Sequence, residues 1–413
     1  MRSMSSVVNK SNLALLPAGV FLFSLPFAHT VAVRLLCLAI ASVTTAVSWY
    51  LRPPPPVPCK LPILLWAVIC ALSVTWSIEP AYSAGELWNE VGYTMLSFLT
   101  FFYFTRSESD WRLWRRIVIT SFVTISIYAI YNYLRHQDWS IGGRVGDVRA
   151  FSTYIVLVMP FLMLASAQAG FGLAPRRLVW LTIPLALVSG YLTLNRMMWV
   201  VLTIEAIVFW AFYLHKSPVH GKVRSTSRVV LVGLCALFAV LSITTSYIKS
   251  RAGERGIEEL QNNIVEDVRP GIWAYAGERF LEHPLIGFGF GRGILRKDLK
   301  RRFDHPMVWH GHNLLVNYAL EMGLLGIAAL LLLLGSLVKE FWKFYAATHQ
   351  DVWELGIAGL VLMAGLITKS MTDDTLVREN SLLFWALMGM TLGLGRRLTT
   401  SSDDPKQVFR LVV

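Results

Sequence analysis

The chain has few charged residues for its length. Charged residues make up 15% of its 413 positions and hydrophobic residues 55%. A soluble globular protein has roughly a quarter of its residues charged. Acidic residues are the scarcer class, with 26 Asp and Glu against 38 Lys and Arg. This composition argues against a soluble globular domain and indicates a protein embedded in a membrane.

Cysteines and nucleotide-binding motifs are also scarce. The four cysteines are scattered in or beside apolar runs, and none lies in the polar insert at 249–311. Their spacing predicts neither a disulfide framework nor a metal site. The alternating glycines Gly287, Gly289 and Gly291 lack the strand–turn–helix context of a dinucleotide fingerprint. No internal repeat is evident, so a two-fold transporter architecture gets no support. We therefore expect no cofactor and no nucleic-acid partner.

Apolar runs recur along the whole chain, and as helices they are long enough to cross a hydrocarbon core of roughly 30 Å. The alternating pattern of a membrane barrel is absent. We therefore expect an all-α polytopic membrane protein with about twelve transmembrane helices in a single membrane domain, residues 1–413. The expected spans are Leu13–Ala28, Leu35–Leu51, Leu61–Ile78, Val91–Thr105, Ile117–Leu134, Phe151–Phe171, Leu178–Leu194, Met197–Leu214, Val229–Ile248, Leu314–Val338, Leu355–Thr368 and Leu382–Leu394.

Loops rich in Lys and Arg alternate with loops that are poor in them. The loop at 106–116 carries four arginines, whereas the connection at 79–90 carries no Lys or Arg. The positive-inside rule then predicts that both termini face the cytoplasm, with a cytoplasmic tail at 398–413. The long basic insert at 249–311, between the ninth and tenth spans, is expected on the periplasmic side. Within it the residue pattern favours short helices at 257–268 and 273–280.

The same count of spans gathers several polar residues on the outer face of the membrane. A charge near membrane depth is costly and is usually paired or functional, although Arg196 could instead snorkel to the headgroups. Arginine suits a pyrophosphate, because its planar fork donates parallel hydrogen bonds and stays charged. The residues on this face are Arg196, Arg269, His312, Asp373, Asp374 and Arg378.

His312 follows the polar insert and precedes an apolar span. A histidine there could accept a proton near neutral pH, as a general base must, or could simply cap the interface. His310, His312 and the Asp373–Asp374 doublet could also bind a divalent metal. Two histidines at i and i+2 share a face only in extended chain, so we favour a site without metal. The acidic doublet could then orient His312 or hold an arginine.

Four stretches of the chain resemble the O-antigen ligase/polymerase family of bacterial envelope enzymes. Residues 75–80 (TWSIEP) resemble its Trp-Ser-x-x-Pro element, and Leu194-Asn195-Arg196 resembles its Ser/Thr-Arg element. Residues 269–289 resemble its Arg-x-x-x-Trp…His-Pro-Leu-x-Gly-x-Gly signature, and residues 312–326 its His-Asn…Glu-x-Gly-x-x-Gly signature. Asn195 and Met197 depart from the pattern, because the family more often has Ser/Thr and a small residue there.

The resemblance implies a GT-C-like, inverting, metal-independent glycosyltransferase in the bacterial inner membrane. Such an O-antigen ligase takes a polysaccharide from undecaprenyl pyrophosphate and joins it to the lipid A–core oligosaccharide on the periplasmic side, which completes lipopolysaccharide. By position, His312 would activate the acceptor hydroxyl, and Arg196 and Arg269 would bind the donor pyrophosphate. We add Arg378, Asp374 and Asn313 as substrate-binding candidates.

Other functions fit parts of the same pattern. An O-antigen polymerase or a protein O-oligosaccharyltransferase would share the donor chemistry and differ in the acceptor. A transporter of a lipid-linked anion would account for a polytopic chain with buried charge. The concentration of candidate groups on one membrane face favours an enzyme over a transporter.

Overall fold

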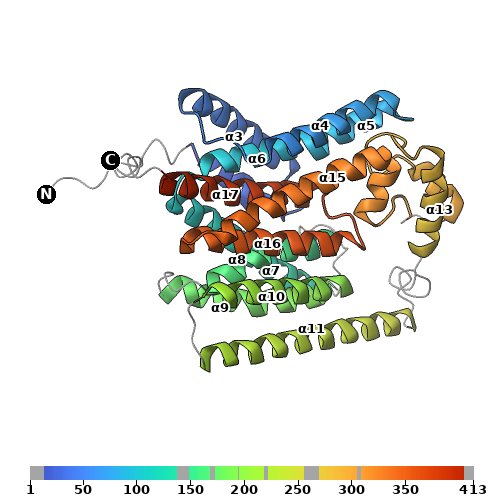
Figure 1. The fold of residues 1–413 in the computed structure, drawn as a ribbon. Coiled ribbons are helices and arrows are strands. Elements are labelled where there is room, and N and C mark those ends of the chain that lie inside the picture. Colours follow the sequence, from blue (N-terminus) through green and yellow to red (C-terminus); the bar gives the residue numbers. More distant parts are fainter. Residues whose placement is uncertain are drawn as a thin grey trace.

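The structure is a computed structural model that describes residues 14–136, 148–167, 173–193, 195–217, 222–254, 269–304 and 308–403. Every regular element within those ranges is a helix, which confirms the predicted all-α class. Figure 1 shows most of the helices side by side, with α13 at one end of the bundle. The elements are α2 (Leu16–Ser24), α3 (Val31–Leu51), α4 (Lys60–Ser73), η1 (Val74–Trp76), α5 (Pro80–Leu87), η2 (Trp88–Gly92), α6 (Tyr93–Phe104), α7 (Glu108–His136), α8 (Val148–Ala167), α9 (Leu173–Leu192), α10 (Arg196–Lys216), α11 (Lys222–Glu254), α13 (Arg269–Glu282), α14 (Arg296–Phe303), α15 (Leu314–Ala346), α16 (Gln350–Ser370) and α17 (Arg378–Asp403).

Five of the described helices are long and apolar enough to cross a membrane, namely α3, α7, α10, α15 and α16. Shorter apolar stretches lie in α4 with η1, in α8, in α9 and in α11. Helix α2 has 9 residues and therefore rises only about 14 Å. The chain is thus a helical membrane protein, and the expected twelve crossings go beyond what these helix lengths establish.

Helices α6 and α17 pack backbone to backbone. A Cβ atom at Gly389 would lie 2.3 Å from the carbonyl oxygen of Phe98, and one at Gly393 would lie 2.6 Å from that of Phe102. Two glycines four residues apart leave one helix face without side chains, so a second helix can approach closely. One turn earlier on α17, Trp385 stacks on Trp66 of α4 with ring centroids 5.9 Å apart. Glycine spacing thus brings α17 into the core beside α4 and α6.

The helix directions define two ends of the bundle. Helix α16 packs against both α15 and α10, and α10 packs against α11 (Figure 1). Lys216, the last residue of α10, donates a hydrogen bond from Nζ to the carbonyl oxygen of Ala347, just past α15, at 3.1 Å. Helices α10 and α15 therefore finish at the same end, which we call the tail end. The opposite end, where α10, α15 and α17 begin, is called the insert end.

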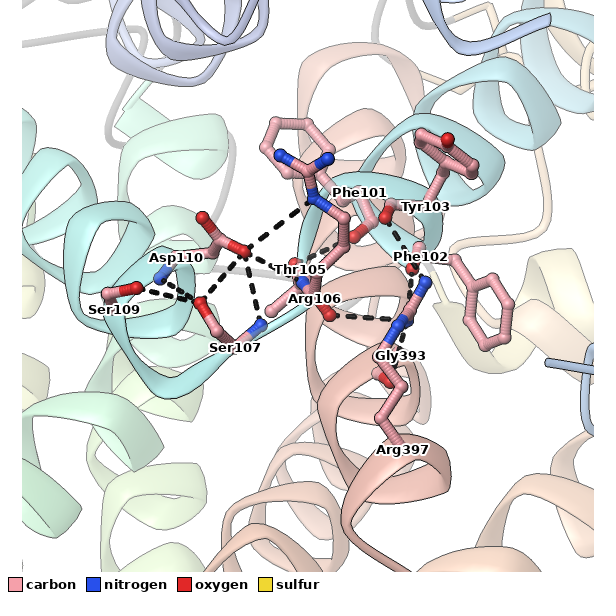
Figure 2. Close-up of polar contacts among 10 residues, drawn as sticks. All are labelled: Phe101, Phe102, Tyr103, Thr105, Arg106, Ser107, Ser109, Asp110, Gly393 and Arg397. Atoms are coloured by element: carbon pink, nitrogen blue, oxygen red, sulfur yellow. Dashed lines mark hydrogen bonds and ion pairs between the residues drawn. The ribbon is translucent and has the colours of Figure 1, made fainter. Parts of the chain in front are cut away.

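Figure 2 shows how the sequence fixes helix termini at the tail end. Arg397 of α17 donates hydrogen bonds to the carbonyl oxygens of Phe102 (2.9 Å) and Thr105 (3.2 Å), where α6 has run out of intrahelical donors. A cation at a helix C-terminus also complements the helix dipole. The next helix, α7, begins with a reciprocal cap: Asp110 Oδ2 accepts the N–H of Ser107 at 3.1 Å, and Ser107 Oγ accepts the N–H of Asp110 at 3.3 Å. Such caps satisfy the first backbone donors of a helix.

Two helices continue past the ends of their predicted apolar runs. Helix α11 continues to Glu254, past the predicted start of the insert at residue 249. The predicted helix at 273–280 lies inside α13, whereas the predicted helix at 257–268 lies outside the described residues. At the other terminus α17 continues to Asp403, past the predicted start of the tail at 398. In both places the helix runs on into polar sequence beyond its apolar run.

Candidate functional site

The loop after α13 forms backbone hydrogen bonds with an interruption in α15. Gly323 has φ +59° and ψ −150°, so the helix is broken there. The break frees backbone groups on both sides of Gly323, and the loop at 284–289 satisfies them. The four bonds measure 2.8 to 3.1 Å: Phe288 N–H to Leu320 O, Gly289 N–H to Glu321 O, Leu324 N–H to Pro284 O and Leu325 N–H to Leu285 O.

Two glycines make this contact possible. A Cβ atom on Gly287 would lie 2.5 Å from the carbonyl carbon of Glu321, and a Cβ atom on Gly323 would lie 2.5 Å from that of Leu285. Both residues also have positive φ, at 62° and 59°, a region that glycine adopts without steric cost. The His-Pro-Leu-x-Gly and Glu-x-Gly motifs are therefore two halves of one backbone contact.

A third motif joins the same loop. The N–H of Ile78 donates to the carbonyl oxygen of Phe288 at 3.0 Å. Trp76 Nε1–H donates to the carbonyl oxygen of Ile286 at 2.8 Å, and Ser77 lies where a side chain at Gly289 would point. Three of the four stretches that carry the family resemblance thus meet in space, although they are about 200 and 30 residues apart in the sequence.

The histidine loop is held on several sides. Trp273 of α13 donates from Nε1 to the carbonyl oxygen of Gly311 at 2.9 Å, and Gly311 N–H donates to Asn317 Oδ1 at 2.7 Å. His312 has φ +49°, an uncommon conformation for a residue with a side chain. Its N–H donates to Nδ1 of His310 at 3.0 Å. Local hydrogen bonds therefore fix the backbone of His312 in a strained conformation beside α15.

His312 faces an acidic residue from a distant part of the chain. Its Nδ1 lies 3.9 Å from Oδ1 of Asp373, in the connection between α16 and α17, and only 8% of His312 is exposed. This separation is an ion-pair distance rather than a hydrogen bond. A carboxylate near Nδ1 favours a proton on that nitrogen. The arrangement leaves Nε2 as the nitrogen that can accept a proton from a substrate.

Asp374 lies beside this pair and is partly desolvated. Its Oδ2 accepts a hydrogen bond from Asn317 Nδ2 at 2.9 Å, and its buried Oδ1 accepts none from the described residues. Burial raises the pKa of Asp374 above its ordinary value, while the nearby guanidinium of Arg292 acts in the opposite direction. Asn317 also holds Gly311, so one side chain joins the acidic connection to the histidine loop.

A cleft at the insert end adds residues that sequence reasoning did not select. Glu321 is 3% exposed and accepts the N–H of Gly291 at 3.2 Å. Arg292 follows the alternating glycines, and its guanidinium lies 4.6 Å from the ring centre of Trp309. The signals in the sequence were the Glu of the Glu-x-Gly motif and the arginine directly after the glycines. Polar residues that line the cleft are Glu86, Glu90, Arg292, Glu321, Asp374 and Ser381.

A row of rings connects this cleft to His312. Trp309 meets His310 edge-on with ring centroids 4.4 Å apart, and the rings of His310 and His312 lie 3.9 Å apart. The guanidinium of Arg292 lies over the ring of Trp309, at one end of this row. A cation over an aromatic face is attracted by the ring quadrupole. Trp309 therefore separates the guanidinium of Arg292 from the His310 ring by a single ring.

The other predicted site residues occupy different positions at the insert end. Asn313 caps α15, since its Oδ1 accepts the N–H groups of Leu315 and Val316 at 2.8 and 3.2 Å. Its Nδ2 donates to Met371 O at 2.9 Å. Arg378 begins α17 with φ +50°, and its backbone N–H donates to the Glu90 carboxylate at 3.2 Å, while its side chain is exposed.

The two arginines of the pyrophosphate prediction lie on different helices. Arg269 begins α13, one turn before the tryptophan that holds the histidine loop. Arg196 begins α10 directly after its N-cap Asn195, is exposed, and lies at the insert end because α10 finishes at the tail end. The structure thus joins His312, Asp373, Asp374 and Asn313 through local contacts. Arg269 is linked to these residues through α13, whose Trp273 contacts the histidine loop. Arg196 begins α10, which packs against α16, and α16 in turn packs against α15.

The site also contains a donor set for a metal. Among the described residues, His310, His312 and Asp373 each offer one ligand atom, and these atoms all lie within 4.8 Å of one another. Two histidines and one carboxylate are a common set at zinc sites that keep an open position. The spacing of these residues in the sequence favoured a site without metal.

Comparisons with known proteins agree with the motifs. Residues 178–331 match the family described as O-antigen ligase, a stretch that includes Arg196, Arg269 and His312. A protein of Rickettsia typhi (strain ATCC VR-144 / Wilmington), provisionally named a polysaccharide ligase, is 30% identical over 102 residues. The match covers 22% of this chain and 25% of that protein, so the chain spans about a quarter of the length of the relative it matches.

The fold and the site define a helical membrane protein with a cluster of titratable side chains at one end of its bundle. The motifs and the matched region at 178–331 are similar to those of the O-antigen ligase family.

Proposed function

We propose that this protein is an inverting, metal-independent glycosyltransferase of the GT-C type that acts as an O-antigen ligase. It transfers a polysaccharide from undecaprenyl pyrophosphate to the lipid A–core oligosaccharide at the periplasmic face of the bacterial inner membrane. The observation that carries the proposal is His312, held beside Asp373 at the insert end and inside the region that matches the O-antigen ligase family.

In this proposal His312 is the general base. The acceptor hydroxyl oxygen attacks C1 of the first sugar, the bond from C1 to the pyrophosphate oxygen breaks, and the hydroxyl proton passes to Nε2 of His312. Asp373 beside Nδ1 stabilises the imidazolium that results. Such a base contributes roughly 10²- to 10⁴-fold to the rate.

The arginines act on the leaving group. Arg196, Arg269 and Arg378 hold the donor pyrophosphate through charge-assisted hydrogen bonds and stabilise the negative charge that grows on it. Asp374 and Asn313 position the loops around the acceptor rather than bind phosphate, because a carboxylate repels it and the amide of Asn313 is bonded within the chain.

The proposed topology has twelve crossings with both termini in the cytoplasm. Lys216 and Arg397 lie at the tail end, as do Arg106 and, one turn into α7, Arg112. Such basic residues are typical of a cytoplasmic face. Helices α2, α4 and α6 are shorter than a full crossing, so flanking segments such as η1 and α5 complete the path through the membrane.

The deciding experiment is reconstitution of the purified protein with undecaprenyl pyrophosphate-linked glycan and lipid A–core. We expect His312→Ala to lower the transfer rate by roughly 10²- to 10⁴-fold, the contribution of a general base, and Arg269→Ala to lower it through loss of donor binding. The matched controls are His349→Ala and Arg301→Ala, whose side chains are 74% and 84% exposed. Near-normal transfer by the His312 variant would overturn the mechanism.

The same reconstitution separates the alternatives. A polymerase extends the donor glycan itself, a protein O-oligosaccharyltransferase needs a polypeptide acceptor, and a transporter moves donor lipid without forming a glycosidic bond. We expect wild-type transfer to persist in excess chelator. Loss of transfer that one added divalent ion restores would overturn the metal-independent mechanism.

A further inference from the structure

The two histidines and the aspartate at the insert end form a compact donor set. His310 and His312 are both buried, with 3% and 8% of their surface exposed, and their rings lie 3.9 Å apart. Asp373 approaches from the α16–α17 connection, and the three ligand atoms lie within 4.8 Å of one another. Imidazole nitrogens and carboxylate oxygens both donate lone pairs to transition-metal ions.

The geometry suits a small transition-metal ion. Zinc binds imidazole nitrogen and carboxylate oxygen at about 2.0 to 2.2 Å, so tetrahedral ligand atoms lie roughly 3.3 Å apart. His312 Nδ1 and Asp373 Oδ1 are already 3.9 Å apart. Asp373 is only partly buried and belongs to a connecting segment rather than a helix, so a side-chain rotation can close the remaining gap. The competing contact is one neutral hydrogen bond, from His312 N–H to His310 Nδ1.

We propose that His310, His312 and Asp373 form a binding site for a divalent transition metal, and that its occupation inhibits glycan transfer. A neutral imidazole has one lone pair and one N–H. Once a metal takes the lone pair of His312, the other ring nitrogen carries the proton, and the ring can no longer accept a proton from the acceptor hydroxyl. The inhibitory part of this inference rests on the proposed function, whereas the binding part does not.

Binding is measured first, on the purified full-length protein in detergent with any purification tag removed. Zn²⁺ is titrated by calorimetry, and Co²⁺ is titrated by its visible absorption, which reports coordination by protein ligands. We expect one site in the wild type. His310→Gln and Asp373→Asn should each weaken binding by more than about tenfold, since loss of even an outer-shell partner costs roughly 10- to 100-fold.

The chain offers a matched control for this measurement. His349 Nδ1 lies 3.8 Å from Asp351 Oδ2 in an exposed pair that lacks a second histidine, so His349→Ala should bind Zn²⁺ as the wild type does. A second variant, His310→Ala, guards against a folding defect of the glutamine variant, and elution as a single species in size exclusion identifies the folded proteins. Equal Zn²⁺ affinity in the wild type and in both folded His310 variants would overturn the site.

Transfer is measured next, with and without Zn²⁺. Saturating Zn²⁺ should abolish wild-type transfer, chelator should restore it, and the His310 variants should need more than about tenfold more Zn²⁺ for the same inhibition. Unchanged transfer at a saturated site would overturn the inhibitory role. Absence of transfer from the metal-free wild type would instead count against the proposed function, while the calorimetric result would still decide the metal site.

Discussion

The side chain of Asn313 is used within the chain at both of its ends. Its Oδ1 caps α15 through the N–H groups of Leu315 and Val316, and its Nδ2 holds Met371 at the end of α16. The sequence suggested a substrate contact because Asn313 follows His312. The hydrogen bonds give a sufficient reason for an asparagine at this position without any substrate.

This structural role can be tested with two substitutions. Asn313→Ala removes the cap and the bond to Met371, and we expect it to lower the free energy of unfolding by about 0.5 to 2 kcal/mol. Asn313→Ser keeps an N-cap oxygen and should recover most of that loss. Thermal denaturation of the purified variants measures both. A serine variant as stable as the wild type yet defective in donor or acceptor binding would favour the substrate contact.

The pKa of Glu90 is higher than that of an ordinary glutamate. Its carboxylate lines the cleft and accepts the backbone N–H of Arg378 at 3.2 Å. Burial raises the pKa of Glu90 to about 8, although Arg292 acts in the opposite direction. The folded protein therefore holds this proton at pH values where the unfolded chain has released it.

We expect the stability of the protein to fall as the pH rises from about 4.5 to about 8, because the folded-state pKa of Glu90 exceeds its ordinary value. The loss should level off above the folded pKa. Glu90→Gln cannot titrate, so its melting temperature should decline less over this range. Glu108→Gln, at an exposed position on α7, is the control. Parallel pH profiles for the wild type and the Glu90 variant would contradict the assignment.

At the scale of elements, the break in α15 organises the insert end. The break supplies backbone groups to the loop at 284–289, and that loop in turn holds residues 76–78 after α4. It also directs Glu321 into the cleft, where its carboxylate holds Gly291. One non-helical residue, Gly323, therefore determines how three separate segments meet.

Replacement of Gly323 by alanine should be costly. Its φ of +59° and ψ of −150° fall in a region that only glycine populates readily, and a Cβ there would lie 2.5 Å from the backbone of Leu285. We expect the free energy of unfolding to fall by about 1 to 3 kcal/mol because of backbone strain. Gly335→Ala on the same helix has open space around it and should be neutral or gain up to about 1 kcal/mol. Equal melting temperatures for the two variants would show that the break is dispensable.

The sequence predicts the elements better than their contacts. Run length and hydropathy predict the helical class and the five helices long and apolar enough to cross a membrane. His312 and Asp373, which the predicted topology placed on one face, lie 3.9 Å apart. The reciprocal bonds between the loop at 284–289 and α15 could not be read from the sequence, because a glycine with positive φ inside an apolar run looks like any other helical glycine. Arg292 and Glu90 were missed because their proximity depends on tertiary packing over about 200 residues.

At the scale of the whole molecule, the two ends of the bundle carry different groups. The tail end holds arginines that cap helices, such as Arg397 of α17, which caps the end of α6 (Figure 2). The insert end holds the histidine pair, the acidic cleft and the basic helix α14. An orientation with the tail end in the cytoplasm satisfies the positive-inside rule and exposes the candidate site to the periplasm.

Labelling of introduced cysteines tests this orientation. Lys300→Cys on α14 and His349→Cys between α15 and α16 are both exposed, at the insert end and the tail end respectively. In spheroplasts that produce a variant without the four native cysteines, a membrane-impermeant maleimide should label the first and should label the second only after lysis. The reverse pattern would place the candidate site in the cytosol and would rule out a periplasmic transfer reaction.

The backbone contact around Gly287 and Gly323 limits which segments at the insert end can move. Movement of the loop at 284–289 would break four main-chain hydrogen bonds at once, so we expect this loop to stay fixed to α15. The segment 371–377 is held to α15 and its N-cap through the side chains of Asn317 and Asn313. Under the proposed function, we expect glycan entry and product departure to displace residues 371–377 rather than the loop at 284–289.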